Sequence, residues 1–122
     1  MIKDILIVGA GSFLGGSTRY IVSLFMHSTG NGFPWATFTV NIVGSLFIGL
    51  LWGMMVRHPN MPSWLPLLLM TGFCGGFTTF STFSKESLAL LQSESYMTFL
   101  LYAVVSVTLG ITAVTLGYLT TK

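Results

Sequence analysis

Charged residues are scarce in this sequence. Of its 122 residues only 7% are charged and 52% are hydrophobic, whereas a soluble globular domain carries roughly 25% charged residues. A chain this apolar cannot face water on all sides, which indicates a membrane protein in contact with the lipid bilayer. The net charge of +2 comes from five basic and three acidic residues. No basic run occurs, so nucleic acid is not expected as a partner.

Cysteine clusters and catalytic motifs are also lacking. Cys74 is the only cysteine, so one chain can form neither an intrachain disulfide nor a cysteine-based metal site. The sequence has no HExxH motif, no paired aspartates and no nucleophile with an adjacent histidine, and His27 and His58 lie between apolar segments. It therefore predicts that the protein is not an enzyme.

What is present is a series of four apolar segments, each close to the roughly 20 residues that a membrane-spanning helix needs. Turn-rich or polar stretches separate them. We predict spanning helices at residues 5–26, 35–56, 63–91 and 96–119. Little of the chain remains outside these segments, so we expect residues 1–122 to form a single all-α membrane domain. The first segment has no clean cleavage site, which favours a retained helix over a signal peptide.

Positive charges are distributed almost evenly between the two ends of these helices. Lys3, Arg57 and Lys122 lie on the side of the N-terminus, and Arg19 and Lys85 lie on the other side. An excess of lysine and arginine normally fixes the orientation of a membrane protein, and here that excess is nearly absent. We therefore predict that the chain inserts in both orientations and forms an antiparallel dimer of two oppositely inserted copies.

The third segment contains an unusual stretch, MTGFCGGFTTFSTFSKE, at residues 70–86. Gly75 and Gly76 each destabilise a helix by about 1 kcal/mol relative to alanine, so we expect the third helix to be broken near residues 75–79. Lipid cannot hydrogen-bond the backbone groups that a break exposes, and the break must be buried in protein or line a polar cavity. Six hydroxyl side chains favour a lined pathway, although each alone is equally compatible with helix packing.

Phenylalanines in the same stretch recur every three residues, at Phe77, Phe80 and Phe83. Such a stripe usually belongs to a core. The alternative is electrostatic, because an aromatic ring has a positive edge, and ring edges turned toward a pore can hold a small anion without any permanent positive charge. The sequence leaves both interpretations open.

The motif GGFTTFSTFSKE, together with TFTVNIVGS at residues 37–45, resembles the Fluc (CrcB-type) fluoride channels of microbes. The resemblance covers the whole chain, including the broken third helix. It implies a passive, fluoride-selective channel that exports cytoplasmic fluoride across the bacterial inner (cytoplasmic) membrane. It also implies a dual-topology antiparallel homodimer with two pores. A structural sodium ion at its centre would be held by the backbone carbonyls of Gly75 and Thr78 of both chains.

The resemblance also assigns side chains to each pore. Phe80 and Phe83 match the phenylalanines of the pore wall, and Asn41 matches a pore-facing asparagine. The other implied pore residues are Thr37, Thr39, Thr82, Ser84, Tyr102 and Ser106, and Arg19 and Glu86 match positions of the vestibule. Asn41 is equally compatible with a clamp between helices, and Arg19 with an anchor that extends to the membrane surface.

Two other classes of protein remain as alternatives. Small multidrug exporters also have four helices and often insert in both orientations, but their chemistry needs an acidic residue inside the first helix. No Asp or Glu occurs between Ile5 and Met26, which argues against this class. The second alternative, a non-transporting membrane scaffold, predicts that the pure protein gives no ion flux.

Overall fold

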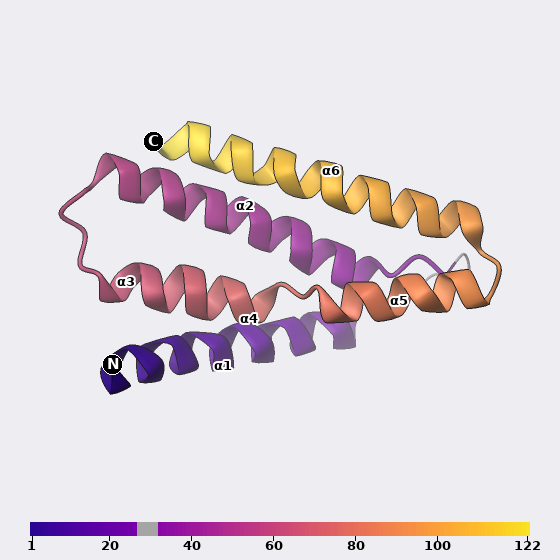
Figure 1. Cartoon of the computed structure of the whole chain (residues 1–122), viewed down its shortest axis with the longest axis horizontal. Coiled ribbons are helices and arrows are strands. Elements are labelled where there is room, and N and C mark those ends of the chain that lie inside the picture. The colour runs from indigo at the N-terminus through magenta and orange to yellow at the C-terminus, as the bar shows by residue number, and fades with distance from the viewer. Residues whose placement is uncertain (27–31) are drawn as a thin grey trace.

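The computed structural model describes residues 1–26 and 32–122, and in these ranges the protein is all-helical (Figure 1). Four spans are long and apolar enough to cross a membrane, which confirms the predicted fold class. They are helix α1 (Ile2–Phe25), helix α2 (Trp35–Arg57), a composite third span (Trp64–Gln92) and helix α6 (Tyr96–Thr121). His27, which we expect between the first two apolar segments, lies outside the described residues.

The third span consists of several helical pieces in a row. It contains α3 (Trp64–Pro66), the π-helix η1 (Leu67–Cys74), α4 (Gly75–Phe77) and α5 (Ser81–Gln92). Across the molecule this span lies between α1 and α2, and α6 packs on the other side of α2 (Figure 1). Beyond the break, α5 also packs against α6.

Glycines allow α2 and α6 to pack closely. A β-carbon added at Gly117 of α6 would lie 2.6 Å from the carbonyl oxygen of Leu46, and one at Gly53 of α2 would lie 2.6 Å from that of Tyr118. Close approach of this kind is the usual role of small residues between helices in lipid. The hydroxyl of Thr121 adds a hydrogen bond of 2.7 Å to the carbonyl oxygen of Leu50.

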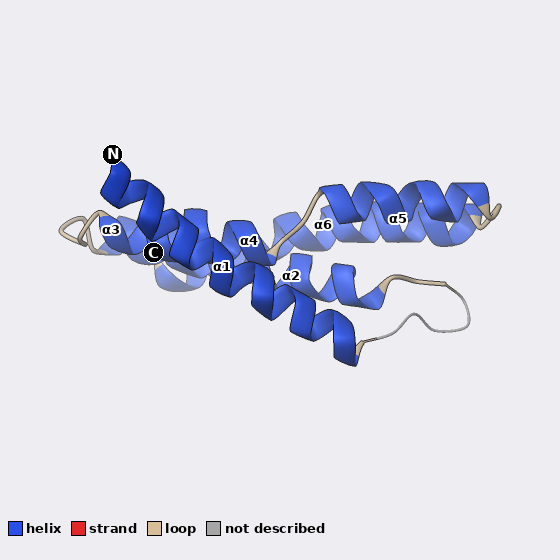
Figure 2. Cartoon of the chain, turned by 90° about the horizontal axis from the view of Figure 1, so that it is seen from below, coloured by secondary structure: helices blue, strands red, loops and turns tan. Residues whose placement is uncertain are grey.

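The break in the third span lies at residues 78–80, between α4 and α5 (Figure 2). Thr78 has an extended backbone, with φ −84° and ψ 159°. Gly75 and Gly76 are both helical members of α4, so the break does not lie at the glycine pair. The prediction that the third helix is broken near residues 75–79 is confirmed, and the chain leaves the helix after Phe77.

The two glycines differ in what surrounds them. A β-carbon at Gly76 would lie 2.7 Å from the carbonyl oxygen of Ser12 in α1, whereas one at Gly75 would have its nearest neighbour, the carbonyl oxygen of Met70, 3.9 Å away. Gly76 is therefore needed for the close packing of α1 against the third span. Gly11 and Gly15 of α1 face the same span at equally short range.

Candidate functional site

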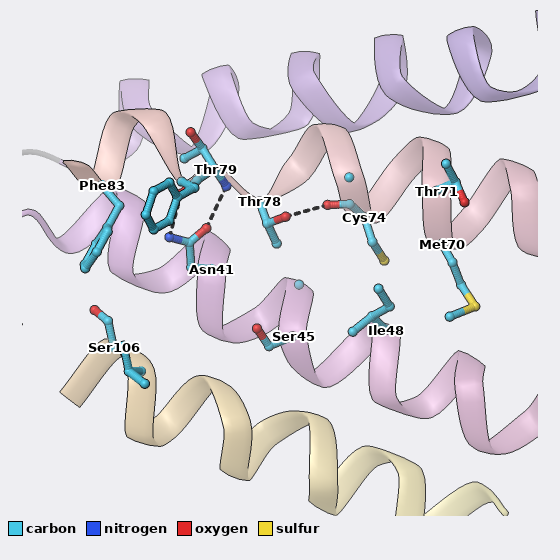
Figure 3. Close-up of a pocket in the computed structure, with 14 residues that line it drawn as sticks. Asn41, Ser45, Ile48, Met70, Thr71, Cys74, Thr78, Thr79, Phe83 and Ser106 are labelled. Carbon is cyan, nitrogen blue, oxygen red and sulfur yellow. Dashed lines mark hydrogen bonds between the residues drawn. The ribbon is translucent and has the colours of Figure 1, made fainter. Parts of the chain in front are cut away.

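A hollow of about 420 Å³ lies beside the break and is lined by α2, both sides of the break, and α6 (Figure 3). Six residues singled out by the sequence line it: Asn41, Gly75, Thr78, Phe80, Phe83 and Ser106. None of the described residues that line the hollow is charged. The site therefore offers neutral dipoles and aromatic rings to a ligand.

Asn41 is bound to the break through both ends of its side-chain amide (Figure 3). Its Nδ2 donates to the carbonyl oxygen of Thr79 at 3.0 Å, and its Oδ1 accepts from the backbone N–H of Thr79 at 2.8 Å. The amide of an asparagine has two N–H donors, so one donor is left for another partner. Asn41 thus satisfies backbone groups that leave the helical pattern at the break.

Thr79, which the sequence analysis did not assign to the site, organises the break from the other side. Its hydroxyl accepts a hydrogen bond of 3.1 Å from the backbone N–H of Thr82 in the first turn of α5. A threonine at the N-cap of a helix commonly accepts a hydrogen bond from the backbone N–H three residues later. Thr79 could have been identified in the sequence on this basis. Thr79 is held by Asn41 and in turn holds the start of α5.

The break leaves the four backbone carbonyls of residues 75–78 without their usual helical donors. In a continuous α-helix the N–H of Thr79 would donate to Gly75 and that of Thr82 would donate to Thr78. These two amides donate to the side chains of Asn41 and Thr79 instead. The carbonyl of Gly76, which lies between them, accepts from the Nε of Arg19 at 3.1 Å. Of these four residues, Gly75 and Thr78 line the hollow, so their carbonyls are available as oxygen ligands for a hard cation.

The phenylalanine stripe divides into core and site residues. Phe77 is buried and stacks on Phe73, with ring centroids 5.7 Å apart and planes at 15°. Phe80 is 78% exposed and its ring centroid lies 5.9 Å from that of Phe83. The core interpretation thus applies to Phe77, whereas Phe80 and Phe83 line the hollow.

Tyr102 lies next to this pair and is completely buried. Its ring centroid is 4.9 Å from that of Phe83, and its hydroxyl donates to Oε1 of Glu86 at 3.0 Å. The hydroxyl of Ser106, one helical turn further along α6, is buried and has no hydrogen-bond partner among the described residues. Ser106 therefore presents a donor that a ligand or water can use.

Arg19 belongs to a second, separate hollow of about 350 Å³ between α1, α2 and α5. Thr37 and Thr82, both predicted site residues, line the same hollow. Because the Nε of Arg19 is bound to Gly76, only its two terminal nitrogens are left to act in this hollow. Thr39, Ser84, Glu86 and Tyr102 line neither of the two hollows.

Comparison with known proteins places the chain in a family. Residues 6–118 match the family model described as CrcB-like protein, Camphor Resistance (CrcB). The chain belongs to the CrcB family. Two relatives are named "Fluoride-specific ion channel FluC". The protein from Azobacteroides pseudotrichonymphae is 40% identical, over 100% of this chain and 98% of the relative. The protein from Phocaeicola vulgatus is 44% identical, over 94% of this chain and 95% of the relative. A third, from Prosthecochloris aestuarii, is 42% identical over 93% and 88%.

Membership of the CrcB family removes one of the two alternatives that the sequence left open. It excludes the small multidrug exporters, and it agrees with the absence of acidic residues from the apolar part of α1. The four spans make the chain a multi-pass membrane protein whose relatives occur in bacteria. The CrcB family and its FluC relatives are not enzymes, as the sequence predicts for this chain.

Proposed function

We propose that this CrcB protein is a passive, fluoride-selective channel that releases fluoride from the cytoplasm. The observation that carries the proposal is its similarity along almost the whole chain to relatives named fluoride-specific ion channels. The uncharged hollow beside the break supports it. An anion can occupy such a site without meeting a carboxylate, and no lysine or arginine among the described lining residues would hold it too tightly for release.

The chemistry of the hollow suits a small, strongly hydrated anion. Removing water from a bare ion is very costly unless other donors replace it. Ring edges of Phe80 and Phe83, the second N–H of Asn41 and the free hydroxyl of Ser106 supply such donors along the route. We expect Thr37, Thr39, Thr82, Ser84 and Tyr102 to extend the route toward its ends. A larger and less hydrated anion such as chloride gains less from these donors.

The functional unit that we propose is an antiparallel homodimer with two pores. Phe80 is 78% exposed in one copy, although it belongs to the site, and a second copy would cover it. The nearly even distribution of basic residues between the two ends favours insertion in both orientations. In this arrangement each pore would take one phenylalanine from each subunit.

A structural sodium ion would lie at the centre of this dimer. The carbonyls of Gly75 and Thr78 from both copies would hold it, since their helical donors are bound elsewhere. Oxygen ligands suit a hard cation, and such an ion would supply the electrostatic partner that these carbonyls lack inside a membrane.

Arg19 is proposed to attract anions at the vestibule. Its terminal nitrogens are the only basic groups among the described residues that line the second hollow, and a positive group at the mouth of a route raises the local concentration of anions. Glu86 is proposed to hold the Tyr102 hydroxyl at the end of the route.

Fluoride release from liposomes tests the proposed function. Purified protein is reconstituted into vesicles loaded with potassium fluoride, and efflux is followed with a fluoride electrode after a potassium ionophore is added. We expect rapid release of fluoride without a proton gradient, and retention of chloride in matched vesicles loaded with potassium chloride. Vesicles that retain fluoride would favour the scaffold, and release that depends on a proton gradient would contradict a passive channel.

A further inference from the structure

Phe33 lies at the centre of an aromatic cluster just before α2. Its ring centroid is 4.4 Å from that of Trp35 and 5.4 Å from that of Phe38. It is also 5.4 Å from the ring of Tyr102, with planes at 78°. Phe33 precedes α2 and is not part of a helix. Its carbonyl oxygen accepts a hydrogen bond of 2.9 Å from the N–H of Trp35, and its ring packs against the three other rings.

Through Phe33 this cluster reaches the end of the proposed route. The ring of Tyr102 contacts the rings of both Phe33 and Phe83. Its hydroxyl donates a hydrogen bond to Glu86. Phe83 comes from α5 and Tyr102 from α6, whereas Phe33 comes from a segment far from both in the sequence. Phe33 therefore ties the ring of Tyr102 to the start of α2, where Thr37 also hydrogen-bonds the side chain of Tyr102.

We propose that Phe33 is a positioning residue for fluoride conduction, which holds the ring of Tyr102 against Phe83 so that its hydroxyl keeps its place on the proposed route. This inference rests on the proposed function. Nearly perpendicular rings are a favoured arrangement of aromatic pairs. Tyr102 is completely buried, so removal of the Phe33 ring opens space beside it into which the tyrosine can turn.

The size of the effect follows from the strength of one aromatic pair. Such a pair changes the equilibrium between two positions of a ring by a factor of roughly two to ten. Since fluoride release requires the hydroxyl in its bound position, Phe33→Leu is expected to lower the rate by the same factor. Phe33→Tyr retains the ring and is expected to retain most of the rate.

Phe38→Leu is the matched control. Phe38 packs on Phe33, and Phe38→Leu replaces a ring by the same aliphatic side chain as Phe33→Leu. Among the described residues, Phe38 makes no ring contact with Tyr102. We expect Phe38→Leu to release fluoride at close to the rate of the unmodified protein. If both variants lose the same fraction of the rate, the cluster acts through general packing and the inference is wrong.

A double-mutant cycle tests whether Phe33 acts through the tyrosine hydroxyl. We expect Phe33→Leu to cause no further loss when it is added to Tyr102→Phe, because the group that it positions is already absent. Independent losses that multiply would overturn the inference, as would an unchanged rate for Phe33→Leu alone. If Phe33→Leu elutes as an aggregate in gel filtration, Phe33→Met replaces it with the same expected outcomes.

The outcomes separate this inference from the function on which it rests. If the unmodified protein does not release fluoride, the proposed function fails and the inference with it. If the unmodified protein releases fluoride and the Phe33 variants behave like Phe38→Leu, only the inference fails.

Discussion

Asn41→Asp is expected to abolish fluoride release while the protein still inserts into the membrane. Aspartate has nearly the shape of asparagine but no N–H, so the donation to the carbonyl oxygen of Thr79 is lost. A carboxylate oxygen would then face that carbonyl oxygen, and a negative charge would enter a hollow whose described lining residues carry none. Repulsion of the anion and loss of the clamp act in the same direction. Efflux from liposomes and thermal unfolding of the purified protein measure the two effects.

Asn41→Ala separates the charge from the clamp. It removes both hydrogen bonds to the part-buried backbone of Thr79 without adding a charge, and unpaired backbone groups cost up to about 1–3 kcal/mol each when buried. We expect a lower unfolding temperature for both variants and some remaining fluoride release for Asn41→Ala only. Normal release by Asn41→Asp would show that this side chain lies off the route.

Phe83→Ile is expected to lower fluoride release by about tenfold or more, and Phe80→Ile to have a similar effect. Isoleucine keeps much of the side-chain volume but has no ring edge to offer an anion. The loss of one contact worth about 1.4 kcal/mol corresponds to a factor of ten. The initial rate of efflux from liposomes, at equal amounts of protein, measures the loss.

Phe13→Ile is the control for these variants. Phe13 is 72% exposed on α1 and lines neither hollow, so its replacement is expected to leave the rate unchanged. Gel filtration shows whether each variant keeps the oligomeric state of the unmodified protein. If both ring variants keep that state and release fluoride at the normal rate, the ring edges play no part in conduction.

The four spans could be predicted from the sequence because apolar segments of sufficient length, separated by polar or turn-rich stretches, are typical of membrane-spanning helices. A break in the third span could also be predicted, but not its cause. From the sequence, Gly76 is expected to destabilise a helix. In the structure it is helical, and its lack of a β-carbon allows α1 to pack closely. No pattern in the sequence indicates the π-helix η1 at Leu67–Cys74.

The site was predictable only as a set of residue types. Asn41 and Thr79 are 38 residues apart, and no local pattern shows that the amide of one pairs with the backbone of the other. The contact between Arg19 and Gly76 spans 57 residues and is hidden for the same reason. Periodicity grouped Phe77 with Phe80 and Phe83, but packing against Phe73 places it in the core.

The central claim is that fluoride moves passively through this protein and that chloride does not. The reversal potential of the purified protein in a planar bilayer tests it most directly, under a tenfold gradient of fluoride and equal chloride on both sides. We predict a reversal potential near the fluoride equilibrium value, about 59 mV in magnitude for one charge, independent of the proton gradient. A reversal potential near zero, or one that follows chloride or protons, would contradict the account.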